Sequence, residues 1–492
     1  MLADEGGYAW ATRSWVNGSG TLYDDIWISR PQGIFYVYAG IFNLFGTGTT
    51  AFRFAAWIAI ALTLVAIWAY ARMYAGPVAA LTSAAIFAVA SASPNLEGYS
   101  ANAEMFMGFP AALAAAWLLF GVRHGFRRWH LVAIGILLGA AITLKPSAAV
   151  MVPVAAAFLV LPASGSERKH AWQQTGWIIV GVALIGIASL IDGWMIGWHN
   201  FVYATMTYRL TAQSAATVGL AYNLEAIGRL ALRALPLLLL VVLLLALKHR
   251  RGAQLVFQAT RSRGWRAGLS TWRRSTRTSI GRCQDAHFLL QLWLVAAIAG
   301  ASVGGDWWAH YLIQLVAPLS IWIGVTLCRL LHAFKPIPTR TLLATAVILL
   351  LLPYRVLLAG GTTAMTQEMF SHPGYPAQAD VAAYLRTHSP LGTTIYVAFD
   401  QASIYYLADR PPAYRHLYDQ ELRGIPSSYA DLIAIIRGPN PPMFIVGTRQ
   451  PGPFADESRA FWSVVGQYYE LVETIDGVPI YQSKATITAP AG

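Results

Sequence analysis

The chain has 492 residues, of which 56% are hydrophobic and only 12% are charged. About one quarter of the residues in a soluble domain are charged, so this composition excludes an ordinary soluble protein and predicts an integral membrane protein. A net charge of +12 could suggest a nucleic-acid partner. In a membrane protein, however, basic residues first report the orientation of the chain, so we predict no nucleic-acid partner. Two cysteines without metal-ligand spacing exclude a disulfide framework and a structural zinc site.

Apolar stretches in the first 358 residues are long enough to cross a membrane, whose hydrocarbon core of about 30 Å needs about 17 to 25 residues per helix. We expect ten transmembrane helices, near residues 53–72, 77–94, 104–121, 130–145, 147–162, 177–197, 229–247, 286–303, 308–328 and 340–358. The break at Lys145-Pro146 is compatible with two helices or with one kinked element. The chain starts on the predicted outer side with no apolar helix before it, so we expect that a first transmembrane helix is missing from this sequence.

Basic residues gather in alternate connections between these helices. Those connections hold 19 of the 35 Lys and Arg residues, and ten of the 19 lie in the single loop 248–285. The positive-inside rule makes this side cytoplasmic. The loop could instead bind anionic lipid or nucleic acid, but a solvated loop that sets the topology is the simpler interpretation.

Acidic residues gather on the opposite side. Nine of the eleven Asp and Glu residues before residue 360 lie in or near the predicted outer loops, at Asp4, Glu5, Asp24, Asp25, Glu97, Glu104, Asp192, Glu225 and Asp306. This distribution predicts a carboxylate-bearing site on the outer face of a transmembrane module, residues 1–358, whose first extracytoplasmic loop is 1–52.

The composition changes after the last apolar stretch, since residues 360–492 hold twelve Asp and Glu against eight Lys and Arg. Strand-like runs at 393–399 and 441–447 alternate with helical patterns, and 469–483 reads as a hairpin with Asp476-Gly477 at its turn. We therefore predict an extracytoplasmic α/β domain over 359–492. It has no phosphate-binding loop, so we interpret it as a cap or acceptor-recognition module.

Two acidic residues open the first predicted loop. At helical spacing Asp4 shares a face with Tyr8 and Trp15, so the segment could lie along the membrane interface. Asp4 and Glu5 are candidates for a general base, because partial desolvation raises a carboxyl pKa toward the useful range. Complementing a helix dipole is an equally good explanation for this acidic pair.

Two basic residues are candidates for binding a phosphate group. Arg30 precedes a proline and an apolar run, and a guanidinium can bind phosphate through two donors. Lys145 lies at the outer end of its predicted helix, where an ammonium needs an anionic partner. Snorkelling toward the interface explains either residue equally simply.

The remaining candidates line a predicted substrate cavity on the outer side: Glu97, Asn102, Glu104, Asp306, His310 and Tyr311. Asn102 and Ser100 could hydrogen-bond a sugar, but Glu104 could also be a first-turn charge in a helix that Ser100 caps. A satisfied interfacial histidine is commoner than a ligand or base, so His310 alone indicates little.

The order of these motifs resembles a known family. An acidic pair followed by Gly-Gly-Tyr8, then Arg30-Pro31, SANAEMFM, LKPSA and HYLIQLVAPL resemble the polyprenyl-phosphate-sugar glycosyltransferases of the GT-C fold class. The likeness is to the bacterial protein-mannosyltransferase and lipid A aminoarabinose transferase group, over residues 1 to about 358. The family often has Lys-Pro-Pro where this chain has Arg30-Pro31-Gln32, which weakens the phosphate role carried to Arg30.

The resemblance implies an inverting glycosyltransferase of a bacterial inner membrane. Its partners would be a polyprenyl-phosphate-linked sugar, an acceptor glycan, lipid or protein, and membrane lipids. Asp4 would be the catalytic base with Glu5 beside it, and Arg30 and Lys145 would hold the donor phosphate. No cofactor is predicted; a divalent metal is possible near Asp4 and Glu5, but the sequence shows no full ligand set.

Two other classes of function compete with this one. A transporter or flippase should show an internal repeat and ionisable groups near mid-membrane, and neither is evident in the sequence. A sensor that binds a ligand through its outer domain would make the first-loop carboxylates dispensable.

Overall fold

The computed structural model describes residues 1–215, 220–263, 282–302, 307–333, 336–358, 360–361, 374–399, 401–448 and 455–487. Contacts divide the chain into two compact units. Unit 1 contains residues 1–52, 189–219 and 356–492, and unit 2 contains 53–188 and 220–355. Each unit is described by itself.

Unit 2 is a helical bundle. Its elements are α3 (Thr49–Ala75) from residue 53, α4 (Pro77–Ser91), η1 (Pro94–Leu96), α5 (Ala103–His124), α6 (Arg128–Leu144), η2 (Pro146–Val150), α7 (Met151–Val160), α8 (Gly165–Val202) up to residue 188, α10 (Leu220–Arg233), α11 (Leu235–Arg263), α13 (Arg282–Ser302), η4 (Ala309–Leu312), α14 (Ile313–Leu331), α15 (Pro336–Leu351) and η5 (Leu352–Tyr354).

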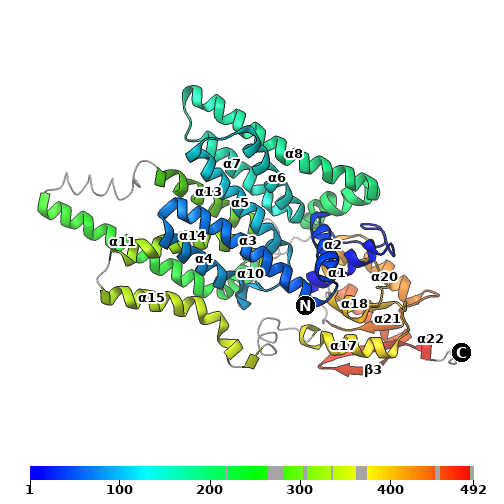
Figure 1. Ribbon diagram of the computed structural model, residues 1–492. Coiled ribbons are helices and arrows are strands. Elements are labelled where there is room, and N and C mark those ends of the chain that lie inside the picture. Colours follow the sequence, from blue (N-terminus) through cyan, green and yellow to red (C-terminus); the bar gives the residue numbers. More distant parts are fainter. Residues whose placement is uncertain are drawn as a thin grey trace. The chain divides into compact units, whose positions relative to one another are not determined.

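Helix α14 lies in the interior of this bundle, where it packs against α4, α5 and α13 (Figure 1). Within its most apolar stretch 72% of the residues are buried, whereas in α8 the share is 17%. Gly324 of α14 permits the close approach of α4, because a Cβ atom at this position would collide with the backbone of Ser83. A helix that exposes an apolar surface as α8 does is suited to contact with lipid.

The long apolar helices support a multi-pass membrane protein. Among the described residues, α3, α5, α8, α13, α14 and α15 belong to six candidate spans, and the bent pair α10–α11 would be a seventh. Shorter apolar helices cover 77–91, 128–144 and 146–160, so each of the ten predicted segments coincides with a helix. The number of membrane crossings stays a prediction, because a helix of 15 to 17 residues is close to the minimum that spans a bilayer.

Proline residues explain where the observed helices depart from smooth spans. Within the predicted segment 229–247 the chain bends by 76° between Arg233 and Leu235. Pro236 lacks an N–H donor and its ring crowds the preceding turn, so it breaks the helix there. At the predicted break, Lys145 adopts an extended backbone before Pro146, which ends α6 and starts η2.

Unit 1 combines short helices with a small sheet. Besides the end of α8, its elements are α1 (Ala3–Val16), α2 (Gly33–Phe45), η3 (Tyr203–Thr207), α9 (Tyr208–Ala215), α17 (Gly374–His388), β1 (Ile395–Val397), α18 (Ser403–Ala408), α19 (Asp419–Gly424), α20 (Ser428–Arg437), β2 (Phe444–Val446), α21 (Ala455–Tyr468), β3 (Tyr469–Ile475), β4 (Val478–Ser483) and α22 (Lys484–Ile487).

The four strands form one sheet in the order β1-β2-β4-β3. Strands β1 and β2 are parallel and fully buried, which suits their unbroken apolar runs. The hairpin β3–β4 turns at Asp476 and Gly477, as predicted, and both residues have positive φ. Asp-Gly favours this turn because both central residues of the tight hairpin type need that conformation.

The N-terminal segment packs within unit 1, where α1 contacts α2 and α18. Gly6 makes this contact possible, since a Cβ atom there would collide with the backbone of Ser403. Tyr8, Phe35 and Tyr38 then form edge-to-face ring pairs between α1 and α2. Residues 1–52, predicted as a loop, therefore hold two helices with a shared aromatic core.

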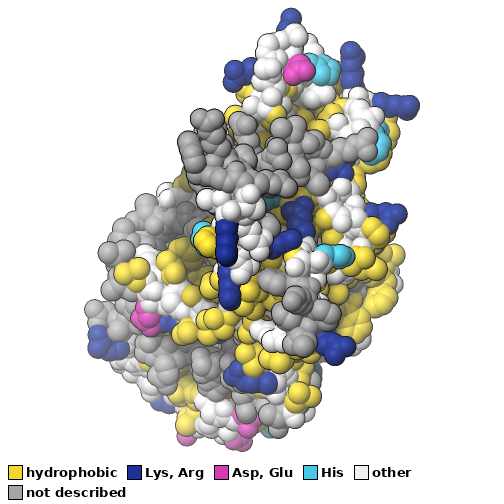
Figure 2. Space-filling view, turned by 90° about the vertical axis from the view of Figure 1, so that its left-hand side faces the viewer, with side chains coloured by type: hydrophobic (Ala, Val, Ile, Leu, Met, Phe, Trp, Pro, Cys, Tyr) yellow, Lys and Arg dark blue, Asp and Glu magenta, His cyan; other side chains and the backbone are white. Residues whose placement is uncertain are grey.

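One face of the molecule carries more Lys and Arg than Asp and Glu (Figure 2). This is the left-hand side of Figure 1, where α11 and α15 of unit 2 lie. Hydrophobic side chains lie between the basic ones. The assignment of the connections beside these helices to the cytoplasmic side stays a prediction.

Gly6→Ala should destabilise unit 1 by about 1–3 kcal/mol, because a methyl group has no room against the Ser403 backbone. Thermal unfolding of the purified protein in detergent measures this as a lower midpoint. Gly40→Ala is the matched control, since this glycine of α2 has nothing within 4 Å of its Cβ position. Equal midpoints for the two variants would contradict the predicted packing.

Candidate functional site

A buried ion pair forms the centre of the candidate site in unit 2. Glu104, in the first turn of α5, contacts the ammonium of Lys145 at the end of α6. Their side chains are 3% and 14% exposed. The Nζ atom of Lys145 also lies 3.8 Å from the centroid of the Tyr311 ring, a cation–π contact. The anionic partner that Lys145 needs is therefore a carboxylate of the protein itself.

His310 joins this ion pair to a second glutamate. Its Nδ1 atom lies 2.7 Å from Oε2 of Glu97, and its Nε2 atom lies 3.7 Å from Oε1 of Glu104. Glu97 also pairs with Arg233, whose Nη1 atom is 3.2 Å from Oε1. The predicted residues Glu97, Glu104, Lys145, His310 and Tyr311 thus lie together.

Local backbone features bring these side chains into place. Glu97 follows η1 in the left-handed conformation, with φ of 56°. The Ser100 hydroxyl donates to the Glu97 carbonyl at 2.6 Å, so Ser100 is not the helix cap that the sequence suggested. The N-cap of α5 is Asn102. Glu104 lies in the first turn of α5, where the helix dipole favours a negative charge.

Asn102 and Asp306 are the two remaining residues of the predicted cavity. Asn102 is fully buried, and its side-chain oxygen and nitrogen make no hydrogen bond within the part of the chain that the structure describes. Asp306 lies outside the described residues.

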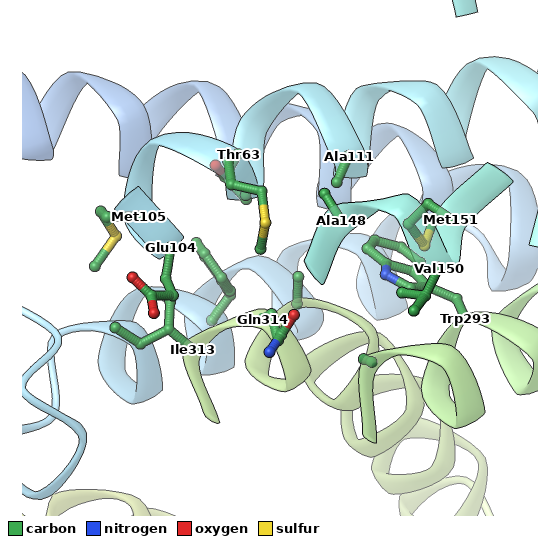
Figure 3. A pocket seen from close by; sticks show the side chains of 15 residues that line it. Thr63, Glu104, Met105, Ala111, Ala148, Val150, Met151, Trp293, Ile313 and Gln314 are labelled. Atoms are coloured by element: carbon green, nitrogen blue, oxygen red, sulfur yellow. The ribbon is translucent and has the colours of Figure 1, made fainter. Parts of the chain in front are cut away.

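A mainly apolar cavity adjoins this cluster (Figure 3). Glu104 and Met105 lie at one end of it, and Met151 and Trp293 lie at the other. Gln314 of α14 also lines the cavity and accepts a hydrogen bond from Ser147 at 3.3 Å. The cavity thus offers an apolar wall with polar groups at the Glu104 end and at Gln314.

Asp4 and Arg30 come together in unit 1. The Nη2 atom of Arg30 lies 3.7 Å from Oδ2 of Asp4, and its Nε donates to the Tyr8 hydroxyl at 3.0 Å. The Tyr8 hydroxyl in turn lies 3.5 Å from the same Asp4 oxygen. The predicted base and a predicted phosphate-binding cation are therefore neighbours.

Glu5 has a structural role. Its Oε2 atom accepts a hydrogen bond from the backbone N–H of Leu2 at 2.7 Å, and the residue is fully buried. This contact satisfies a backbone donor at the start of α1. Among the described residues no group of three or more His, Cys, Asp or Glu side chains could hold a metal ion.

Tyr418 and Glu421 are buried ionisable residues of the C-terminal segment, and Tyr418 contacts the start of α1 within unit 1. The Tyr418 hydroxyl donates to the Ala3 carbonyl at 3.4 Å. Burial raises the pKa of Tyr418 well above its usual value, and the Asp4 charge adds to that effect. Burial likewise raises the pKa of Glu421, although His416 and the Leu417 N–H partly offset the rise. Tyr418 therefore stays protonated and can donate.

Sequence reasoning missed Arg233, Arg209 and Gln314. Arg209 of α9 donates to the Ser29 carbonyl at 3.1 Å, as does Arg30 at the same distance, so two guanidinium groups converge there. The only available sequence signal was for Arg233, which lies three residues before Pro236 at a helix break. Gln314 lies within the quoted segment HYLIQLVAPL but was not singled out, and nothing in the sequence signalled Arg209.

Comparisons with known proteins bear on this arrangement. Residues 29–191 match the model of the dolichyl-phosphate-mannose-protein mannosyltransferase family. A structure of ArnT from Cupriavidus metallidurans bound to undecaprenyl phosphate superposes with a TM-score of 0.58 at 15% identity, over 99% of this chain and 94% of that chain. A search of the curated proteins finds no match.

An oligosaccharyltransferase also has a similar fold. The apo form from Archaeoglobus fulgidus gives a TM-score of 0.52 at 12% identity, over 91% of this chain and 66% of that chain. AglB of the same organism, in complex with an inhibitory peptide and a dolichol-phosphate, gives 0.50 at 12% identity, over 90% and 65%.

This chain has the GT-C fold. The resemblance inferred from the sequence is thereby confirmed at the level of the fold. The segment that matches the mannosyltransferase family model, residues 29–191, includes Arg30, Glu97, Asn102, Glu104 and Lys145. It includes neither Asp4 nor His310. The roles of these residues, and a cavity shared by Asp4, Arg30, Glu104 and Lys145, stay predictions.

Glu104→Gln should lower the stability of the protein by about 3–5 kcal/mol, because it leaves the Lys145 ammonium without its buried anionic partner. The thermal midpoint in detergent is the measurement. Glu225→Gln is the control, since the Glu225–Arg229 pair is exposed and should contribute little. Adding Lys145→Met to Glu104→Gln should restore part of the loss; no restoration would mean that the pair is not coupled.

Proposed function

We propose that this protein is an inverting glycosyltransferase that moves a sugar from a polyprenyl-phosphate donor to an acceptor outside the cytoplasm. The observation that carries the proposal is the Asp4–Arg30 pair, because it brings a candidate base and a candidate phosphate-binding cation together in unit 1. The GT-C fold and the family match to residues 29–191 support it. They favour a transferase over a transporter or flippase.

Asp4 would act as the general base. Its carboxylate accepts the proton of the acceptor hydroxyl or amine as the oxygen or nitrogen bonds to the anomeric carbon of the sugar. The bond from that carbon to the phosphate oxygen breaks at the same time, and the polyprenyl phosphate leaves with the electron pair. Attack and departure on opposite faces invert the configuration.

Arg30, in unit 1, and Lys145, in unit 2, are the two cations that we propose as candidates for stabilising the phosphate that leaves. Fixed cations in a site with little water stabilise developing negative charge without a reorganisation cost. Both cations already contact carboxylates, Asp4 and Glu104 respectively. A phosphate would therefore exchange partners with these carboxylates on binding. Tyr8 would keep Arg30 oriented through its hydroxyl while this exchange occurs.

The proposal extends to the setting of the enzyme. ArnT was solved with undecaprenyl phosphate and AglB with a dolichol-phosphate, so a lipid phosphate is the donor carrier that we propose here. The acceptor would be a glycan, a lipid or a protein. We place the enzyme in a bacterial inner membrane with residues 359–492 outside the cytoplasm, and we assign it no metal.

Asp4→Asn should lower the rate of sugar transfer by about 10²–10⁴-fold, because an amide cannot accept the proton. The assay measures sugar released from a polyprenyl-phosphate donor in membranes, with expression checked by immunoblot. Asp24→Asn is the control, since Asp24 is an exposed carboxylate of the same segment. Wild-type turnover in Asp4→Asn would remove Asp4 from the mechanism.

The proposed orientation has a separate test. Protease added outside spheroplasts should digest residues 359–492, because that segment would face the external medium. Immunoblotting with tags at residue 492 and in loop 248–285 reports both sides in one sample. Full protection of the C-terminal tag, with digestion in loop 248–285, would reverse the topology.

A further inference from the structure

Five ionisable side chains of unit 2 form one continuous array: Arg233, Glu97, His310, Glu104 and Lys145. They come from five separate parts of the chain, at the ends of α10, η1 and α6 and within η4 and α5. Cations lie at both ends, carboxylates lie next to them, and the imidazole is in the middle. The charge of the imidazole therefore controls the charge of the whole array.

The two sides of His310 differ. Nδ1 lies 2.7 Å from Oε2 of Glu97, a hydrogen bond, and the carboxylate can only accept, so Nδ1 carries a proton. Nε2 lies 3.7 Å from Oε1 of Glu104, beyond hydrogen-bond distance. That same Oε1 atom contacts the Lys145 ammonium. Glu104 therefore contacts one cation, the Lys145 ammonium, and has a second potential hydrogen-bond donor, Nε2 of His310, close to it.

A phosphate that draws Lys145 away would leave Glu104 without its cation. The Glu104 side chain is 3% exposed, and an unpaired buried carboxylate is costly. Histidine is the side chain that readily changes charge between pH 5 and 8. A proton on Nε2 would give Glu104 a new partner from a group that is already in place.

We propose that His310 is a positioning residue that takes up a proton at Nε2 when a phosphate group takes Lys145 from Glu104. The proton comes from solvent, an N–H bond forms on Nε2, and that N–H donates to Glu104. Release of the phosphate returns the proton and restores the Glu104–Lys145 contact. This inference rests on the proposed role of Lys145 in binding the donor phosphate.

The surroundings of His310 favour this exchange. Among the described residues the charged groups that face its ring are Glu97 and Glu104, with Arg233 and Lys145 one position further away. The ring therefore lies among two negative and two opposing positive charges. Tyr311 packs edge-on against the ring at 5.0 Å. Neutralising Lys145 with phosphate removes one of the two opposing charges.

Calorimetry of the full-length protein in detergent tests the proposal. A short-chain polyprenyl phosphate is titrated at pH 8 in two buffers with different ionisation enthalpies, which gives the number of protons taken up on binding. The second phosphate pKa is about 6, so at pH 8 the ligand is fully ionised and the uptake reports the protein. Wild type should take up a measurable fraction of a proton, to a maximum of about one.

His310→Asn should bind the lipid phosphate with no such uptake, because asparagine can still hydrogen-bond Glu97 but does not titrate. His287→Asn is the matched control, since His287 lies in α13 and contacts Tyr74 instead of this array. It should take up as many protons as wild type.

Each outcome decides between the claims. No proton uptake by wild type, or equal uptake by wild type and His310→Asn, would overturn the role of His310. If His310→Asn does not fold, His310→Gln takes its place, because glutamine does not titrate either. Unchanged affinity in Lys145→Met would instead overturn the phosphate role of Lys145, which is the proposed function and not this inference alone.

Discussion

The pairing of charges in a poorly solvated interior constrains this structure more than any other interaction. Glu97 and Glu104 are nearly inaccessible to water, so each needs a partner of opposite charge within contact distance. Arg233, His310 and Lys145 supply those partners. Because the members belong to five separate elements, the array fixes several helix ends of unit 2 at once. Losing one member would leave a buried charge on its neighbour.

Unit 1 obeys the same constraint. Asp4 pairs with Arg30 and Tyr8, while buried Glu5 turns back to the N-terminus of its own helix. The predicted base and the predicted phosphate-binding cations are thus already neutralised by the protein. An anionic donor would bind by exchanging partners with Asp4 or Glu104. In both the proposed mechanism and the proton uptake inferred for His310, the donor phosphate therefore separates a carboxylate from its cation.

Irregular backbone is concentrated beside the charged residues of unit 2. Lys145 lies at the extended break before Pro146, Glu97 has positive φ after η1, and Arg233 ends α10 at a bend of 76°. Non-helical backbone is tolerated at membrane depth only where protein buries it or where it lines a cavity. These breaks place Lys145, Glu97 and Arg233 in the charged array, and Glu104 of the same array lines the apolar cavity.

The sequence alone determined the apolar helices, the β3–β4 hairpin and the candidate residues, because apolar run length, alternation and the Asp-Gly turn are local signals. Its motif order also indicated the GT-C resemblance. Only the tertiary structure decided which charges pair: Lys145 with Glu104, Glu97 with Arg233, and Glu5 with its own helix start. Helix α19 was also not predicted from the sequence. Pairing depends on distances between residues far apart in the chain, and one sequence does not contain those distances.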